Sequence, residues 1–247
     1  MLTADGCRKD YRMKKDLNDI CLVIQARLSS ERLPKKMLLP FSDTNIMDIA
    51  LEKITHIKAI DWKKSFYLSA YEPELKNVAE KYGLQVFHRS RESAFSEGNP
   101  MGEMYEWHDK LGFKYCILIN ACAPFLKPET IDSFINSFAN SESEGMFGVM
   151  KKKNYFWNKG GELVTPWPAG QDCLNTKEVE ETLEAAHCLY AGRLDTIKDG
   201  VWMGDFNSPG DIELFPMEEF ECLDIDYPWE FKMCESIYLS NQREKPK

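Results

Sequence analysis

The sequence lacks a long apolar run and an excess of positive charge, and each absence excludes a class of protein. No segment approaches the roughly 20 apolar residues that a membrane-spanning helix needs, and the polar residues 1–19 lack the apolar segment of a secretion signal. The chain carries 40 acidic and 31 basic residues, a net charge of -9, so it offers no diffuse basic surface for nucleic acid. We therefore expect a cytoplasmic protein with neither a membrane nor a nucleic-acid partner.

The sequence also lacks the spacing patterns of common metal and nucleotide sites. Its eight cysteines include no C-x-x-C pair, and several lie in apolar runs, which favours buried free thiols over disulfides or a zinc site. His56, His88 and His108 have no metal-ligand spacing. The Gly-Lys-Ser/Thr of a P-loop is absent, so the sequence does not support a Walker-type NTPase.

Short apolar runs alternate with helical patterns along the first 140 residues. Ile20 to Gln25 has the composition of a buried parallel strand, and the helical pattern from Pro128 to Phe138 has Pro and Glu in its first turn. Further strands are predicted at 65–69, 84–87 and 115–119, and further helices at 45–60, 72–82 and 101–111. This alternation predicts a single Rossmann-like, three-layer α/β domain with a mostly parallel sheet.

The pattern is weaker in the second half of the chain. Residues 142–172 are predicted to form a small insert or hairpin with a loop, around a strand at 146–150. Helices are predicted at 177–184, 194–198 and 229–239, and a last strand at 220–225. We assign residues 20–247 to one domain and residues 1–19 to a flexible N-terminal extension.

The first strand ends in a loop that holds four cations within ten residues, from Arg27 to Lys36. Ligands bind at the carboxyl ends of strands in open α/β sheets, which is where this loop begins. A cation about 4 Å from a phosphate contributes roughly 4 kcal/mol at an effective dielectric near 20, before desolvation. A triphosphate is the natural ligand, and composition alone leaves a solvated basic turn as the alternative.

The residues of this loop resemble a known nucleotide-binding signature. The pattern A-R-x-x-S-x-R-L-P-x-K is similar to that of the CMP-Kdo and CMP-sialic acid synthetases, the sugar-acid cytidylyltransferases, and its matching residues are Arg27, Ser30, Arg32, Leu33, Pro34 and Lys36. The resemblance implies a fold of the nucleotide-diphospho-sugar transferase type and makes residues 20–247 a catalytic domain. It also implies CTP as the nucleotide, which spacing alone does not reveal.

The same resemblance assigns roles within the loop. Arg27, Ser30 and Lys36 are expected to contact CTP, with Arg32 and Lys36 nearest the phosphates. The backbone of Ala26 is expected to lie close to the base.

A pair of carboxylates stands near the end of the chain, at Asp224 and Asp226. If the predicted strand continues through them, both side chains project from one face, and their mutual repulsion favours a bound Mg²⁺. A solvent-facing polar edge is the alternative. The surrounding residues 223–231 resemble the D-I-D region of the sialic-acid enzymes, which makes both aspartates expected metal ligands.

A third segment, residues 120–131, follows the strongest middle strand and resembles another landmark of the same family. Aligning its Pro124 with the Q-G-D-E-P of the Kdo enzymes puts Cys122 where those enzymes have a metal-binding aspartate. This is a departure from the Kdo pattern, and it leaves the later aspartate pair as the expected metal site. No neighbouring base is evident, so we interpret Cys122 as a packing residue rather than a nucleophile.

Further candidates lie outside these motifs. Arg89 and Arg91 follow the third strand, where a guanidinium suits a nucleotide or a substrate carboxylate, although surface exposure is equally expected. The acceptor pocket should draw on residues 146–205, with Gln171 and His187 as the principal candidates and Asp172 and Tyr190 as further ones.

The resemblance implies that the anomeric hydroxyl of a 2-keto-3-deoxy sugar acid attacks the α-phosphate of CTP and releases pyrophosphate, in the synthesis of surface polysaccharide. Arg27, Arg32, Lys36 and Asp226 are the expected catalytic residues, and a homodimer is expected. Three alternatives stay open: a nucleotidyltransferase acting on a sugar phosphate or other phosphorylated alcohol, a nucleotide-binding homologue that has lost catalysis, and a glycosyltransferase with a similar core.

Overall fold

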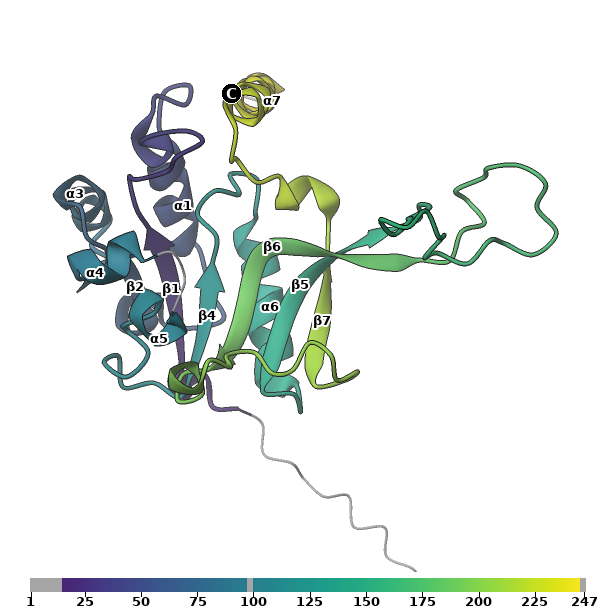
Figure 1. The fold of residues 1–247 in the computed structure, drawn as a ribbon. Coiled ribbons are helices and arrows are strands. Elements are labelled where there is room, and N and C mark those ends of the chain that lie inside the picture. Colours follow the sequence, from purple (N-terminus) through teal and green to yellow (C-terminus); the bar gives the residue numbers. More distant parts are fainter. Residues whose placement is uncertain (1–14, 97–99, 245–247) are drawn as a thin grey trace, which may run out of the picture.

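Seven strands form one sheet in the order β3-β2-β1-β4-β6-β5-β7 in the computed structural model, which describes residues 15–96 and 100–244 (Figure 1). Strands β1 to β4 are parallel to one another, β6 runs antiparallel to β4 and β5, and β7 is parallel to β5. The bounds of the strands are β1 Ile20–Ala26, β2 Phe66–Ala70, β3 Gln85–His88, β4 Tyr115–Ile119, β5 Gly145–Lys152, β6 Thr182–Arg193 and β7 Ile212–Met217.

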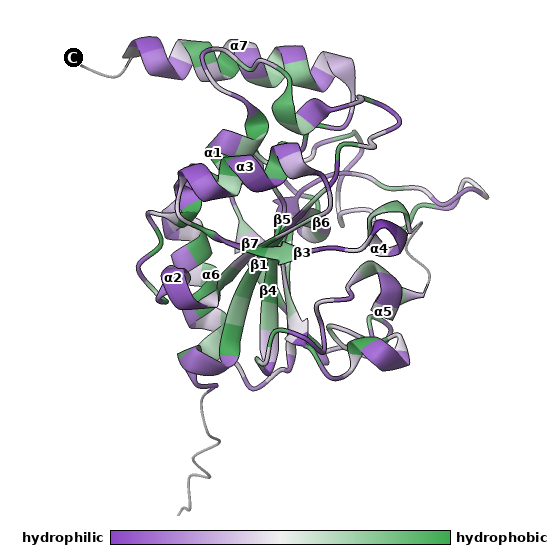
Figure 2. Ribbon diagram, turned by 90° about the vertical axis from the view of Figure 1, so that its left-hand side faces the viewer, coloured by the Kyte–Doolittle hydropathy of each residue, from purple (hydrophilic) through white to green (hydrophobic). Residues whose placement is uncertain are grey.

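The helices cover both faces of this sheet. Figure 2 shows α1 (Ile46–Ile54), α2 (Trp62–Ser65), α3 (Pro73–Lys81) and α6 (Pro128–Asn140) on one side, and the short helices α4 (Arg91–Phe95) and α5 (Met101–Met104) on the other. Alternate residues of β1 serve the two layers, since Leu22 packs in the main core and Val23 in the cluster around Trp107. A strand buried on both faces needs apolar residues at every position, which explains the continuous run in the sequence. The predicted single three-layer α/β domain is confirmed.

The β5–β6 hairpin extends beyond the sheet as an arm. The pairing of Lys152 with Thr182 closes its described ladder, and residues 153–181 form the long connection that projects from the body (Figure 1). This is the predicted insert or hairpin, and it begins and ends later in the chain than expected. Residues 177–181 are irregular and Thr182 begins β6, so the predicted helix at 177–184 is wrong.

The last third of the chain differs most from the expectation. The predicted strand at 220–225 is wrong, because the 3₁₀ helix η4 (Glu219–Cys222) stands there and is followed by irregular backbone up to α7 (Pro228–Glu244). The apolar pattern came from Phe220, which stacks on Phe125 at 4.6 Å between ring centroids, and from buried Cys222. The seventh strand, β7, was not predicted. At residues 194–198 only the 3₁₀ helix η3 (Ile197–Asp199) forms, and α5 covers only the first turn of the predicted helix at 101–111.

The part of the N-terminal extension that the structure describes is attached to the domain. The Nζ of Lys15 donates to the carbonyls of Phe138, Ser141 and Ser143 at 3.2, 2.8 and 2.7 Å, and Leu17–Asp19 forms the 3₁₀ helix η1. The rest of the predicted flexible extension, residues 1–14, lies outside the described residues. Within the described ranges, none of the helices is long and apolar enough to cross a membrane.

Candidate active site

A pocket of about 770 Å³ opens at the carboxyl ends of β1 and β4. This is the edge of the sheet to which the sequence assigned both motif loops. The residues that line it come from four segments, and they are Gln25, Ala26, Arg27, Ser30, Glu31, Arg32, Lys36, Met37, Arg89, Ser96, Met104, Asn120, Ala121, Cys122 and Asp226. All of the predicted nucleotide-binding residues and the predicted catalytic residues are therefore brought together.

The basic loop and the C-terminal carboxylate meet directly. Lys36 donates from Nζ to the carbonyl of Ile225 at 2.6 Å and to Oδ1 of Asp226 at 2.9 Å, while Arg32 pairs with Oδ2 of Asp226 at 2.7 Å. Burial lowers the pKa of Lys36, but Cys122 and Asp226 together outweigh it, so that its pKa lies above the usual value. Lys36 is therefore a fixed positive charge inside the pocket. Together Lys36 and Arg32 bind both carboxylate oxygens of Asp226.

The backbone of the basic loop folds back on itself. Lys35 adopts a left-handed conformation with φ of 57°, and its amide donates to the carbonyl of Leu28 at 3.1 Å. The amide of Leu28 in turn donates to Oε1 of Glu72, at the start of α3, at 2.8 Å. Leu28 and Leu33 pack against the main core, so apolar anchors hold the loop while Arg27, Arg32 and Lys36 line the pocket.

The two aspartates do not lie on a strand, so the predicted projection from one strand face is wrong. They flank Ile225, whose amide donates to the carbonyl of Cys122 at 3.0 Å, in an irregular segment before α7. Glu230 of α7 fixes the end of that segment, because its Oε2 accepts from the amides of Asp226 and Tyr227 at 2.7 and 2.8 Å. The pair is nevertheless close together: burial and the charge of Asp226 raise the pKa of Asp224.

The middle loop after β4 forms the opposite wall. The backbone amide of Asn120 donates to the carbonyl of Cys188 at 2.9 Å, and its side-chain Nδ2 donates to the carbonyl of His187 at 2.9 Å. Its Oδ1 accepts from the amide of Cys122 at 2.8 Å. Sγ of Cys122 lies 3.8 Å from Sδ of Met37. Burial raises the pKa of this thiol to about 11, so it stays protonated near neutral pH, which favours the packing interpretation.

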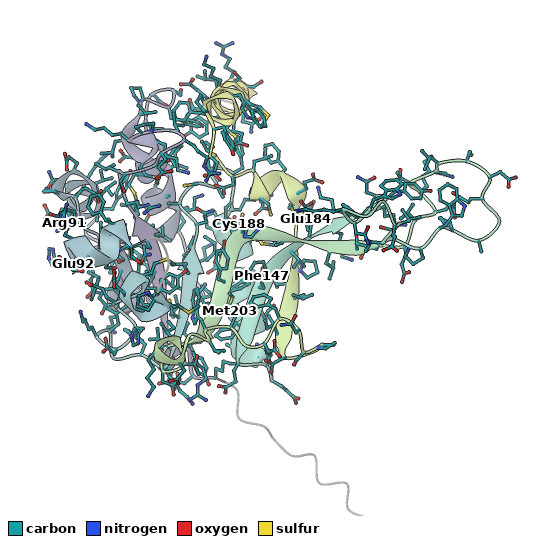
Figure 3. All side chains as sticks on the ribbon, viewed as in Figure 1. Arg91, Glu92, Phe147, Glu184, Cys188 and Met203 are labelled. Atoms are coloured by element: carbon teal, nitrogen blue, oxygen red, sulfur yellow. The ribbon has the colours of Figure 1, made fainter. Side chains whose placement is uncertain are left out.

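Arg89 lines the pocket, but its guanidinium already donates hydrogen bonds to neighbouring protein groups. Its Nε donates to Oγ of Ser93 at 2.8 Å, and its Nη2 to the carbonyls of Ser93 and Met104 at 2.6 and 3.2 Å, which ties α4 to α5. Burial and the nearby Arg27 lower its pKa to about 10. Arg91 is exposed, lies at the outer edge of the molecule in Figure 3, and stacks over Phe95 at 5.3 Å.

The two acceptor candidates are placed differently. His187 is next to the pocket, since its carbonyl accepts from Asn120, and its φ of 53° marks the irregularity in the β5–β6 ladder, where the register shifts between Phe147 and Val149. The hydroxyl of Tyr190 lies 3.4 Å from its Nδ1. Gln171 lies in the arm, where its carbonyl accepts from Trp167, and Asp172 is exposed beside it; neither lines the pocket.

Among the pocket residues that sequence reasoning missed are Gln25 and Asn120. Asn120 joins three segments, and Oε1 of Gln25 accepts from Nε1 of the buried Trp107 at 2.8 Å. Both residues stand at the end of a buried strand, and a polar residue at that position is the signal that could have found them.

Sequence comparison assigns the chain to a family. A sequence model of that family, described as cytidylyltransferase, matches residues 21–190, which span the basic loop, the middle loop and β6 as far as Tyr190. The chain belongs to the cytidylyltransferase family. The expected family and enzyme class are thus confirmed at this level. The spore coat polysaccharide biosynthesis protein SpsF of Bacillus subtilis is 24% identical over 133 residues, which cover 52% of this chain and 53% of that protein.

Solved structures share the fold of this cytidylyltransferase. A CMP:2-keto-3-deoxy-manno-octonic acid synthetase complexed with CTP superposes with a TM-score of 0.62 at 12% identity, covering 90% of this chain and 99% of the other. A 4-diphosphocytidyl-2C-methyl-D-erythritol synthase from Anaerococcus prevotii gives 0.62 at 13% identity, with coverages of 91% and 98%. A cytidylyltransferase from Leptospira borgpetersenii gives 0.59 at 15% identity, with coverages of 90% and 87%. At these identities the likeness shows the fold alone.

Proposed function

We propose that this cytidylyltransferase transfers CMP from CTP to the anomeric hydroxyl of a 2-keto-3-deoxy sugar acid and releases pyrophosphate, in polysaccharide biosynthesis. The observation that carries the proposal is the meeting of Arg32 and Lys36 with Asp226 in one pocket, at 2.7 and 2.9 Å. A site that binds a polyphosphate and neutralises its charge during transfer needs cations, and carboxylates that can bind a metal ion, within a few ångströms of one another. The family match supports the cytidylyl group, and the first-loop motif supports a sugar acid.

The nucleotide step follows from the charges of the pocket. Phosphate oxygens of CTP would take over Lys36 and Arg32 from Asp226, and Arg27 adds a third cation to the same wall. Positioning and charge neutralisation provide most of the catalysis in phosphoryl transfer. Because Lys36 stays positively charged near neutral pH, it can balance the charge that develops on the leaving pyrophosphate.

Mg²⁺ is part of the proposal, and the residues present fit it. Oδ1 of Asp224 is buried without a hydrogen-bond partner, and Asp226 becomes available once phosphate has taken its two cations. Among the residues that the structure describes, no group of three or more His, Cys, Asp or Glu side chains is arranged to hold a metal, so phosphate and water would complete the ligand shell. The ion, when bound, would neutralise charge on the transferring phosphate.

The acceptor is proposed to lie on the β6 side of the pocket. The backbone carbonyl of His187 accepts from Asn120, its Nδ1 lies 3.4 Å from the hydroxyl of Tyr190, and Phe147 packs edge-on against Tyr190 with 5.1 Å between centroids. Polar groups on an aromatic floor suit a sugar ring with hydroxyl substituents. Gln171 does not line the pocket of its own chain, so it stays a candidate only if the arm reaches the pocket of a second copy of the chain.

The homodimer is likewise a proposal. The arm exposes large apolar side chains, with Trp157 55%, Leu174 68% and Val164 64% exposed, and such surface is typical of protein contacts. Light scattering coupled to size exclusion should give twice the monomer mass. A monomer at micromolar concentration would contradict the proposal without affecting the site.

The test of function is an acceptor screen with pyrophosphate release as the readout. Kdo, sialic, legionaminic and pseudaminic acids are compared with sugar phosphates and other phosphorylated alcohols, each with CTP, UTP and GTP. We expect release with CTP and one sugar acid. Release only with a phosphorylated alcohol would favour the related nucleotidyltransferase, and tight CTP binding without turnover on any acceptor would favour a homologue that has lost catalysis.

A further inference from the structure

Lys53 is a buried lysine behind the pocket that the proposed mechanism does not use. It lies on α1 among buried aliphatic residues such as Ala50 and Ile54, and it is itself 7% exposed. Its Nζ donates to the carbonyl of Ala123 at 2.9 Å. A buried ammonium costs several kcal/mol in desolvation unless partners compensate it, so an aliphatic residue would be the cheaper choice at this place.

The carbonyl that Lys53 holds belongs to the middle loop of the active site. One residue earlier, the carbonyl of Cys122 accepts from the amide of Ile225, between the two aspartates, at 3.0 Å. The loop therefore stands between the Lys53 ammonium on one side and the carboxylate segment on the other. A displacement of Ala123 would therefore move the Cys122 carbonyl, and with it Ile225 and the two aspartates that flank it.

A second contact joins the end of the middle loop to η4, which precedes the two aspartates in the chain. Glu221 of η4 is 3% exposed, and its carboxylate accepts from the amide and the Nζ of Lys127 at 3.1 and 2.8 Å. The titratable groups near Lys53 are the charged Glu221 carboxylate and the Cys188 thiol of β6, whose pKa is raised, so that it stays neutral (Figure 3). Lys53 and Glu221 are thus two buried, oppositely charged residues, and the exposed Lys127 pairs with Glu221 at the start of α6.

The charge of Lys53 changes within a range that experiments can reach. Burial lowers its pKa to about 8, while the charge of Glu221 acts in the opposite direction. Below that pH the ammonium donates a charge-assisted hydrogen bond and attracts Glu221. Above it the neutral amine keeps only a weaker hydrogen bond.

We propose that Lys53 is a positioning residue whose protonated form holds the middle loop, and through it Asp224 and Asp226, in the arrangement that transfers CMP. The inference rests on the proposed function. It predicts that turnover falls as the pH rises through the titration of Lys53, while the KM for CTP changes little, because the cations of the basic loop keep their own contacts.

The test compares kcat and KM from about pH 6.5 to 9.5 in wild type, Lys53→Met, Lys53→Arg and Leu51→Ala. Lys53→Met should lower kcat about 10-fold at pH 7 and remove the decline at high pH. Lys53→Arg should restore part of kcat and keep it at pH 9. Leu51→Ala, a fully buried residue on the same helix, should lose stability yet keep the shape of the wild-type profile.

Glu221→Gln gives a second test that keeps Lys53 in place. Glu221 raises the pKa of Lys53, so neutralising it should move the decline to lower pH. If Lys53→Met does not fold, this shift decides the matter, and an unmoved decline overturns the inference.

A readout that needs no acceptor separates this inference from the proposed function. The rate of alkylation of Cys122, followed on its own peptide by mass spectrometry, reports the position of the middle loop. We expect Lys53→Met to raise that rate several-fold at pH 7.5, and Leu51→Ala to leave it within a factor of about two. A wild type without turnover refutes the proposed function only. A folded Lys53→Met with unchanged alkylation, and with unchanged kcat where wild type is active, overturns the role of Lys53.

Discussion

Asp226→Asn should have opposite effects on CTP affinity and on turnover. In the free protein Asp226 occupies the cations that CTP needs, so neutralising it removes a competitor for phosphate. Lys36 is 11% exposed, and a charged hydrogen bond of this kind is worth about 1.5 kcal/mol. Asparagine keeps an oxygen acceptor and so about half of that value, which leaves about 0.75 kcal/mol, or roughly fourfold tighter binding of metal-free CTP.

Turnover should fall in the same variant, because the proposed Mg²⁺ loses a ligand. We expect a decrease of 100-fold or more, about 2.7 kcal/mol of transition-state stabilisation. Calorimetry without metal measures the first effect and pyrophosphate release against magnesium concentration the second. Asp61→Asn, an exposed carboxylate paired with Lys64, controls for the change in net charge. Weaker metal-free binding, or magnesium curves that match wild type, would refute the reasoning.

Three further predictions follow from the same geometry. Lys36→Ala should weaken CTP binding by roughly 1.5 to 3 kcal/mol, as should Arg27→Ala, but only the Lys36 variant should also lose stability in urea unfolding, since it releases the carboxylate segment. The pKa of Asp224 is raised, so its protonated form stabilises the fold below the ordinary carboxyl pKa, and this stabilisation is lost as the pH rises. Asp224→Asn should therefore have a higher melting temperature than wild type at pH 7. The difference in melting temperature should be gone at about pH 3.5. CTP should slow the alkylation of Cys122 and leave that of the exposed Cys173 unchanged, and equal protection of both would place the nucleotide elsewhere.

Most elements of the first 140 residues were predictable because their signals are local, although the helix expected at 101–111 forms only its first turn. The apolar run of β1 and the Pro-Glu start of α6 follow directly from burial on both faces and from helix geometry. The later elements depend on tertiary contacts. The residues around Phe220 form η4 and not a strand because that ring stacks on Phe125, and β7 pairs with β5 although its residues alternate weakly.

The site divides in the same way. The basic loop was predictable because its charges and its anchors are contiguous in sequence, and the structure brings Arg27, Ser30, Lys36 and Arg89 to one pocket. The role of Lys53 was not predictable, because a lysine in an amphipathic helix is expected at the surface and its partner is 70 residues away. The geometry of the aspartate pair also depends on a distant contact, from Cys122 to Ile225.

The most direct test of the central claim is the ³¹P NMR spectrum of the product formed from CTP and the sugar acid that supports turnover. Attack by an anomeric hydroxyl on the α-phosphate leaves one phosphodiester, so we predict a single product resonance beside free pyrophosphate, absent with Asp226→Asn over the same time. A pair of coupled resonances beside free phosphate would show attack on the β-phosphate and transfer of CDP, and would contradict CMP transfer to a sugar acid.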